Sequence, residues 1–232
     1  MIYVCSDIHG DYEKYIRIFE TINFTDNDTL FILGDIVDRG NDSIKILQDM
    51  MDRHNVIPIL GNHEYMAKVV LEKCVNEIIE DNVHIVDKNL TSSIADWFIN
   101  GGVTTFKEFK ELSNSDKYAI LNYIEEFLVY EEISVKGQDY ILIHAGISNF
   151  DESKNMNEYY LDELLFERTD YSKTYFKDKI LITGHTPVSQ IQENHNKNTI
   201  FKANNHIAID GGCGFGGNLI VYCLNNDETL YI

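Results

Sequence analysis

Gly34-Asp35-Ile36-Val37-Asp38-Arg39-Gly40 directly follows a short apolar run, residues 29–33, and the rest of the chain is organised around this arrangement. The same pattern occurs on either side of it. Asp7-Ile8-His9-Gly10 follows the apolar residues 1–5, and Gly61-Asn62-His63-Glu64 follows residues 56–60. Short apolar runs rich in β-branched residues predict buried strands. The polar motifs are therefore expected at the ends of successive strands.

Three later apolar runs end in the same way, at His144, at His185 and, less sharply, at Asp210. Asp7, Asp35 and Asn62 are separated by 28 and 27 residues, which is the length of a strand–helix unit and predicts parallel neighbours joined by right-handed crossovers. In open α/β sheets, ligands bind outside the carboxyl ends of the strands. We therefore expect these side chains to meet at one rim of the molecule.

The remaining periodicity predicts an α/β sandwich of two central β-sheets flanked by helices, built as a single domain over residues 1–232. Helices are expected over 11–22, 42–53, about 63–81 and 157–167. A helical insert is expected at about 82–130, with a short strand or loop at 83–86, helices at 91–99 and 104–112, and a helix over 115–129 that begins at the N-cap Ser115. Further strands are expected at 131–135, 140–144, 180–183, 199–202, 206–210, 218–223 and 228–232.

The composition excludes several classes of protein. A net charge of −19, from 38 acidic and 19 basic residues, argues against a nucleic-acid surface, which requires a basic stripe. No apolar run reaches the length of a membrane span. The four cysteines form no Cys-x-x-Cys pair, and because an apolar run typical of a strand stands at residues 1–5, we expect no signal peptide. We expect a cytoplasmic protein, and nothing in the sequence demands more than a monomer.

The strand-end side chains form a set of two carboxylates, three imidazoles and one amide: Asp7, His9, Asp35, Asn62, His144 and His185. Oxygen and nitrogen donors suit Mn²⁺, Fe or Zn²⁺. Six donors are too many for one open catalytic site but suit two metals about 3.5–4 Å apart, which acidify a bridging water toward a nucleophilic hydroxide. Asp35, from the central unit, is the natural bridging carboxylate. Taken singly, each of these residues would read as a structural histidine or a turn aspartate.

Four further residues are candidates for phosphate binding and acid catalysis: Arg39, Arg168, His63 and Asp38. Arginine presents a planar fork that matches phosphate oxygens, and Arg39 lies four residues after Asp35. For Arg168, spacing alone leaves phosphate binding and a surface salt bridge equally open. His63 is placed to protonate the leaving oxygen, with Asp38 orienting it; a purely structural histidine is the alternative.

These motifs resemble those of a known family. Residues 7–10, 34–40 and 61–64 look like the three signature motifs of the phosphoprotein phosphatase family, and residues 144–147 and 184–187 resemble its two later metal-histidine motifs. Residues 97–102, 164–168, 210–212 and 216–219 are similar to the small bacterial and phage serine/threonine phosphatases of that family. The resemblance extends from residue 1 to about 223, and the order and spacing of the motifs agree throughout.

The resemblance implies a two-metal, calcineurin-like fold with Mn²⁺ as the expected metal. It places Asp7, His9 and Asp35 on one metal, and Asp35, Asn62, His144 and His185 on the other. It also assigns phosphate binding to Arg39 and Arg168, and the acid role to His63 with Asp38. Phe166 is a departure, because many bacterial relatives have Trp there, but an aromatic side chain is kept.

The expected activity is hydrolysis of phosphoserine or phosphothreonine in proteins or peptides, with dual specificity toward phosphotyrosine as a variant. The alternative is a dinucleoside polyphosphate hydrolase acting on a substrate such as diadenosine tetraphosphate, with RNA 5′-end decapping as a variant. Bacterial symmetrical members of that group typically lack the residue equivalent to Asp38 and carry Asp in place of Glu64, which favours the phosphatase. A non-catalytic scaffold, the third hypothesis, would be expected to have lost ligands or His63, and all are present.

Overall fold

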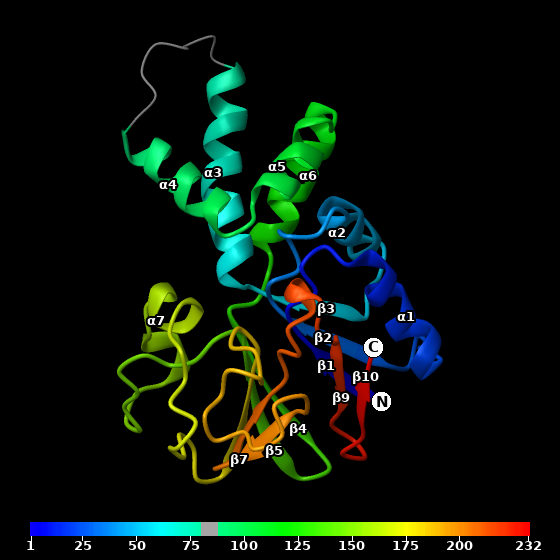
Figure 1. The fold of residues 1–232 in the computed structure, drawn as a ribbon, viewed down its shortest axis with the longest axis vertical. Coiled ribbons are helices and arrows are strands. Elements are labelled where there is room, and N and C mark those ends of the chain that lie inside the picture. The colour runs from blue at the N-terminus through cyan, green and yellow to red at the C-terminus, as the bar shows by residue number, and fades with distance from the viewer. Residues whose placement is uncertain (80–87) are drawn as a thin grey trace.

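The computed structural model describes residues 1–79 and 88–232, and it contains two five-stranded sheets with helices around them (Figure 1). The predicted strand or loop at 83–86 lies outside the described residues. No helix in the described part of the chain is both long enough and apolar enough to cross a membrane.

The first sheet has the strand order β10-β9-β1-β2-β3. Its strands are β1 (Ile2–Cys5), β2 (Thr29–Leu33), β3 (Val56–Ile59), β9 (Ile220–Cys223) and β10 (Thr229–Tyr231). β1, β2 and β3 are parallel, as the spacing of the motifs predicts, while β9 and β10 continue the sheet antiparallel. The carboxyl ends of β1, β2 and β3 therefore point the same way.

The second sheet has the order β4-β5-β6-β8-β7. Its strands are β4 (Tyr130–Val135), β5 (Gln138–Ile143), β6 (Lys179–Thr183), β7 (Phe201–Ala203) and β8 (His206–Ala208). β4 and β5 form the predicted hairpin, and β5, β6 and β8 are parallel. Six parallel strands, three from each sheet, thus deliver the residues that follow their carboxyl ends.

The helices form the outer layers. They are α1 (Tyr12–Ile22), α2 (Ser43–Met51), α3 (Asn62–Ile79), α4 (Lys88–Ile99), α5 (Val103–Lys110), α6 (Asn114–Glu125) and α7 (Leu161–Leu165), with 3₁₀ turns η1 (Met156–Glu158) and η2 (Cys213–Phe215). Figure 1 shows α1 and α2 beside the first sheet, whereas α3 to α6 extend together beyond the strand ends. α3 begins directly in the third motif.

Alternation along the strands divides the core into layers, because successive side chains point to opposite faces of a sheet. In β2, Leu30 and Ile32 pack toward α1 and α2, while Phe31 and Leu33 pack between the sheets. On β5, Leu142 also faces the space between the sheets, and Ile141 faces the far side, under η1 and α7. Both sheets are thus covered on both faces, which fixes the register of each strand.

Two helix predictions are wrong in their bounds. The helix expected over 115–129 spans Asn114–Glu125, and its N-cap is Ser113, whose hydroxyl accepts the backbone N–H of Asp116. Its end is early because Leu128 exchanges backbone hydrogen bonds with Pro58 and Leu60 at the end of β3.

The helix expected over 157–167 is interrupted. Tyr159 and Tyr160 are extended, and Tyr160 instead caps α7. The carboxylate of Glu158 accepts the N–H of Asn155, and that of Glu163 accepts the N–H of Tyr160, so each short element has its own start signal. Two competing caps five residues apart therefore replace one continuous helix.

Candidate metal centre and active site

The site is built from turns in which the backbone is held in the left-handed region. Twelve non-glycine residues in the described part of the chain have positive φ, and six of them are predicted site residues: Asp7, His9, Asp35, Asp38, Arg39 and His185. Such conformations are costly for non-glycine residues and gather at functional sites. The turns after β1, β2 and β6 therefore adopt a strained backbone conformation that orients these side chains.

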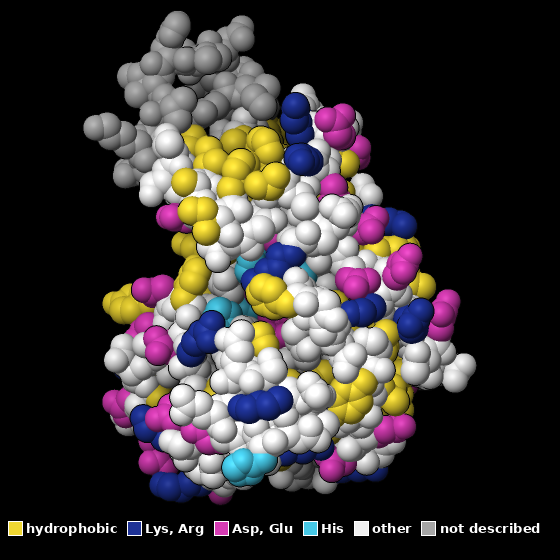
Figure 2. Space-filling model, viewed as in Figure 1, with side chains coloured by type: hydrophobic (Ala, Val, Ile, Leu, Met, Phe, Trp, Pro, Cys, Tyr) yellow, Lys and Arg dark blue, Asp and Glu magenta, His cyan; other side chains and the backbone are white. Residues whose placement is uncertain are grey.

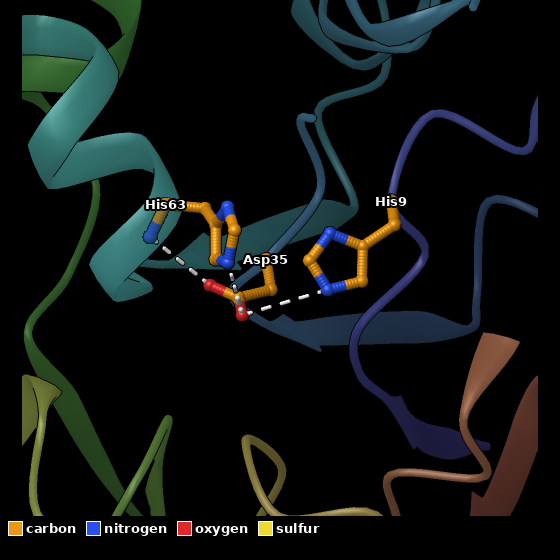
Figure 3. A group of neighbouring side chains, drawn as sticks. All are labelled: His9, Asp35 and His63. Atoms are coloured by element: carbon orange, nitrogen blue, oxygen red, sulfur yellow. Dashed lines mark hydrogen bonds and ion pairs between the residues drawn. The ribbon is translucent and has the colours of Figure 1, made fainter. Parts of the chain in front are cut away.

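Two groups of possible metal-binding side chains share the carboxylate of Asp35. His9 and His63 form the first group with it, and His144 and His185 form the second; within each group the donor atoms lie within 4.8 Å of one another. Figure 3 shows the rings of His9 and His63 converging on Asp35. The Nε2 of His9 is 3.6 Å from one Asp35 oxygen, and the Nε2 of His144 is 3.3 Å from the other. Asp35 therefore occupies the central position that the sequence predicts.

Asn62 completes the second group. Its side-chain oxygen lies 2.9 Å from Nε2 of His144 and 3.0 Å from Nδ1 of His185, and those two nitrogens are 3.2 Å apart. Three neutral donors that follow the ends of β3, β5 and β6 thus point at one spot beside Asp35. This is a converging set of the kind that holds a cation.

Asp7 lies at the edge of these groups. Its carboxylate accepts hydrogen bonds from the hydroxyl of Ser6 and from the N–H of His185, at 3.0 Å in the latter case. Burial, and then the charges of Asp210 and Asp35, raise the pKa of Asp7 well above its ordinary value. Three acidic groups thus crowd one buried rim, which is the electrostatic situation that bound cations relieve.

Two of the three histidines predicted to bind metal are oriented by backbone carbonyls. Nδ1 of His9 lies 2.9 Å from the carbonyl of Val37, and Nδ1 of His144 lies 2.7 Å from that of Leu33, so each Nε2 faces the centre. Burial lowers the pKa of His9 and of His185 to about 3 and also lowers the pKa of His144. These imidazoles are neutral near pH 7, and the neutral form is the one that binds metals.

His63 differs from its neighbours because it is paired with a carboxylate. Its Nδ1 is 2.7 Å from Asp38, while its Nε2 faces Asp35 at 3.8 Å. Burial lowers the pKa of His63, but Asp35 and Asp38 outweigh this effect and raise it above its ordinary value. The predicted His63–Asp38 pair is therefore present, with a ring that favours carrying a proton.

The α4–α5 segment holds the carboxylate of Asp38 in place by hydrogen bonds. The indole N–H of Trp97 donates to one carboxylate oxygen at 2.8 Å, and the hydroxyl of Thr105 donates to the other at 2.7 Å. The backbone N–H of Arg39 donates to the carbonyl of Gly101 at 3.0 Å. Reasoning from sequence did not give these roles to Trp97 or Thr105, and no local signal could have, because the partners are 59 and 67 residues apart.

Glu64 organises the two main turns. Its buried carboxylate accepts the backbone N–H groups of Gly61 and of three consecutive residues, Asp35, Ile36 and Val37. Burial raises the pKa of Glu64 to about 7, while these hydrogen bonds oppose the rise. Glu64 thus ties the motif after β3 to the motif after β2, a structural role that sequence reasoning did not assign.

The two predicted arginines lie differently. The guanidinium of Arg39 lies at the centre, with one nitrogen 2.5 Å from Nε2 of His9 and the other 3.2 Å from Nε2 of His63. Arg168 is exposed, and its hydrogen bond goes to the side chain of Gln190 at 3.0 Å rather than to another predicted site residue. Its charge still contributes to lowering the pKa of His185, after burial and His144.

A family model for calcineurin-like phosphoesterases matches residues 1–212. The chain belongs to this family. The fold prediction is thereby confirmed, and so is the resemblance to the metallophosphoesterases that contain the phosphoprotein phosphatases. The family uses centres of two metal ions, and the converging donors around Asp35 fit such a centre.

Two relatives of this calcineurin-like phosphoesterase are bis(5′-nucleosyl)-tetraphosphatases, one asymmetrical and one symmetrical. An asymmetrical bis(5′-nucleosyl)-tetraphosphatase, PrpE of Anoxybacillus flavithermus, is 26% identical over 255 residues, covering 100% of this chain and 94% of that protein. A symmetrical bis(5′-nucleosyl)-tetraphosphatase of Salmonella paratyphi B is 38% identical over 64 residues, only 27% of this chain and 23% of that protein.

Two solved structures are similar in fold. One is described as a putative diadenosine tetraphosphatase, with a TM-score of 0.63 and 15% identity over 100% of this chain and 92% of that one. The other is a Saccharomyces cerevisiae protein serine/threonine phosphatase, with a TM-score of 0.60 and 14% identity over 100% of this chain and 78% of that one. At these identities the likeness concerns the fold alone.

Proposed function

We propose that this phosphoesterase hydrolyses phosphoric ester or anhydride bonds at the rim where the six parallel strands end. The observation that carries the proposal is the position of Asp35 between two groups of donors, with the His63–Asp38 pair and the Arg39 fork beside it. Phosphoryl transfer demands charge stabilisation and a proton for the leaving oxygen, and these groups supply both.

Two divalent cations, with Mn²⁺ preferred and Fe or Zn²⁺ as the alternatives, would be held by the six predicted ligands. Asp7, His9 and Asp35 would hold one, and Asp35, Asn62, His144 and His185 the other. Bound there, such ions would polarise the phosphoryl group and lower the pKa of an attacking water. The donor set fits them because it combines buried carboxylates with neutral imidazoles and an amide oxygen.

The protein's own side chains account for the other requirements. Arg39 presents its fork to phosphate oxygens at the centre, and Arg168 would add a second such contact. His63 holds a proton on its ring while Asp38, fixed by Trp97 and Thr105, keeps the imidazole oriented. His63 gives that proton to the leaving oxygen.

The substrate has two candidates. In the sequence comparison, the presence of Asp38 and Glu64 favours a serine/threonine phosphoprotein as the substrate. In the structure, however, Asp38 orients His63 and Glu64 ties two turns together, and both roles are compatible with either substrate. The full-length similarity to a bis(5′-nucleosyl)-tetraphosphatase favours a dinucleoside polyphosphate. The chemistry described above is common to both.

A side-by-side assay tests the proposal. The Mn²⁺-loaded protein is given a phosphoserine peptide and diadenosine tetraphosphate at matched concentrations, with an EDTA control. We expect hydrolysis of at least one of them that EDTA abolishes, and the ratio of kcat/KM values then ranks the two substrates. Hydrolysis that persists in EDTA, or none with metal bound, would contradict the proposal.

A further inference from the structure

A cavity of about 410 Å³ lies beside the two arginines and belongs to none of the roles assigned above. Gln190, the hydrogen-bond partner of Arg168, lines one part of it, and Phe215 lines another. The ring of Phe215 lies over the guanidinium of Arg39, 4.3 Å from its carbon to the ring centroid. The cavity therefore adjoins the side chains that would hold a phosphate, and its size is within the about 300–1,000 Å³ typical of small-molecule sites.

Phe215 is an exposed aromatic side chain at the end of the turn η2. It is 70% exposed although it stands next to the buried centre. Gly214 brings the loop against the site, since a Cβ there would lie 2.4 Å from the ring of His9 and 2.9 Å from a nitrogen of Arg39. Arg39 covers one face of the Phe215 ring, and much of the rest of the side chain is open to stack on a ligand. Figure 2 shows histidine side chains recessed in the middle of this face, with basic and hydrophobic side chains beside them.

The polar lining of the cavity suits a heteroaromatic base. The side-chain amides of Asn198 and Asn218 have no hydrogen-bond partner among the described residues, so they are free to read donor and acceptor edges. Lys197 adds a positive charge that forms no ion pair within the described chain. Side-chain amides pair with the edges of purines, and aromatic rings stack on their faces.

Charge distinguishes this cavity from its neighbours. None of its lining residues is acidic, although the chain carries a net charge of −19. A cavity lined by Arg168 itself also contains Lys173 and the acidic Glu167 and Asp170, and one beside His9 and Arg39 is lined by Asp11, Glu13 and Asp42. The Phe215 side is therefore the one of these three cavities whose lining places no carboxylate beside an anionic substrate.

We propose that the cavity lined by Phe215, Gln190, Asn198 and Asn218 binds the nucleobase of a nucleoside phosphate whose phosphate lies at Arg39 and Arg168. The proposal rests on the proposed function and names its substrate class as nucleotides. A phosphoserine side chain carries no ring to stack on Phe215 and does not use the two free amides.

Binding of two matched ligands tests the proposal. Adenosine 5′-monophosphate and ribose 5-phosphate carry the same phosphate and sugar, and only the first has a base. Their inhibition constants against hydrolysis of p-nitrophenyl phosphate are measured for the wild type, Phe215→Ala, the conservative Phe215→Tyr, and Tyr118→Ala, which removes an exposed ring on α6. We expect the base to improve wild-type affinity about tenfold or more.

The variants give the decisive comparison. Phe215→Ala should bind both ligands equally, while Phe215→Tyr and Tyr118→Ala should keep the preference for the nucleotide. Equal affinities in the wild type, or a preference that survives Phe215→Ala, would overturn the proposal. The proposal would also be overturned if Phe215→Ala weakened the binding of a peptide ligand only, because the cavity would then bind peptide.

A kinetic comparison separates the cavity from the arginine beneath it. Phe215→Ala also removes the ring that lies over the guanidinium of Arg39. If the variant loses activity because Arg39 is disturbed, kcat/KM must fall equally for diadenosine tetraphosphate and for inorganic tetrapolyphosphate. We expect kcat/KM for the dinucleotide to fall about tenfold more than for tetrapolyphosphate. Equal losses would refute the base site and leave the proposed hydrolysis intact, whereas a wild type that hydrolyses no phosphorylated substrate with metal bound would refute the proposed function itself.

Discussion

The strand-end rim and the α4–α5 segment meet at the same turn, Asp35 to Arg39, but they contact it in different ways. On the rim, histidines and Asn62 face the centre and share the carboxylate of Asp35. From α4–α5, Trp97 and Thr105 donate hydrogen bonds to the carboxylate of Asp38, and the Gly101 carbonyl accepts the backbone N–H of Arg39. The comparison separates the rim, whose side chains are proposed to supply the chemistry, from α4–α5, which fixes the position of Asp38.

The largest effect is expected from removing a rim donor. In His144→Ala, one of the three neutral donors, which are Asn62, His144 and His185, is lost. Hydrolysis should fall by more than about a hundredfold, because the loss of a residue that only hydrogen-bonds to a metal ligand already costs about 10–100-fold. Manganese content and kcat are measured together. His195→Ala, a change at an exposed histidine, is the control and should retain both.

The loss of kcat on removing His63 should depend on how much the leaving group of the substrate needs a proton. In His63→Asn, we expect kcat to fall about 10²–10⁴-fold on an alkyl phosphate such as phosphoserine, since general acid catalysis contributes that much. The loss should be small on p-nitrophenyl phosphate, whose leaving oxygen needs no proton. Equal losses on the two substrates would mean that His63 does not act as the acid.

A smaller effect on kcat is expected from changing Trp97, which donates a hydrogen bond to Asp38. Trp97→Phe removes the N–H that donates to Asp38 at 2.8 Å and should lower kcat about tenfold without raising KM, in line with the loss of one outer hydrogen bond. Phe98→Leu changes a neighbouring ring that makes no such bond and should have little effect. In a His63→Asn background, Trp97→Phe should cost nothing further, because its effect passes through His63. A full additional loss there would show that Trp97 acts only on the fold.

The smallest effect on activity is expected far from the turn, at His206. This histidine is buried, stacks on Tyr171 and bonds the hydroxyl of Thr183, and burial lowers its pKa from 6.5 to about 3. Because the folded protein resists protonation there, its stabilising contribution is complete above pH 6.5 and declines by about 1.4 kcal/mol per pH unit between pH 6.5 and 3. His206→Phe should leave kcat unchanged and reduce the loss of unfolding free energy on acidification, measured by urea denaturation at several pH values. An identical acid dependence in both proteins would contradict this assignment.

The difference between the two regions also explains how much the sequence could predict. Asp35, Asp38 and Arg39 stand within five residues, directly after an apolar run, so local pattern and the rule for parallel strands were sufficient to bring them to the rim. His144 and His185 followed from the same rule, although they belong to the second sheet. The roles of these residues as ligands and catalysts stay predictions.

The α4–α5 contacts could not be predicted, because nothing in the helical pattern around Trp97 or Thr105 records which turn they will meet. Cap choice was equally local and equally ambiguous: Ser113 and Ser115 are two residues apart, and only the folded backbone shows which hydroxyl accepts the N–H of Asp116. The free amides beside Phe215 come from separate loops and become a site only when the chain is folded. Sequence reasoning thus recovers what one strand and its following turn contain, and misses what distant segments bring to that turn.

The most direct test of the account is the manganese stoichiometry of the wild type and Asp35→Asn, measured by titration calorimetry alongside hydrolysis of both candidate substrates. Asp35 lies between both groups of donors, so the account predicts two ions per chain in the wild type, fewer in the variant, and loss of hydrolysis on both substrates. An Asp35→Asn protein that still binds two ions and hydrolyses either substrate at the wild-type rate would contradict it.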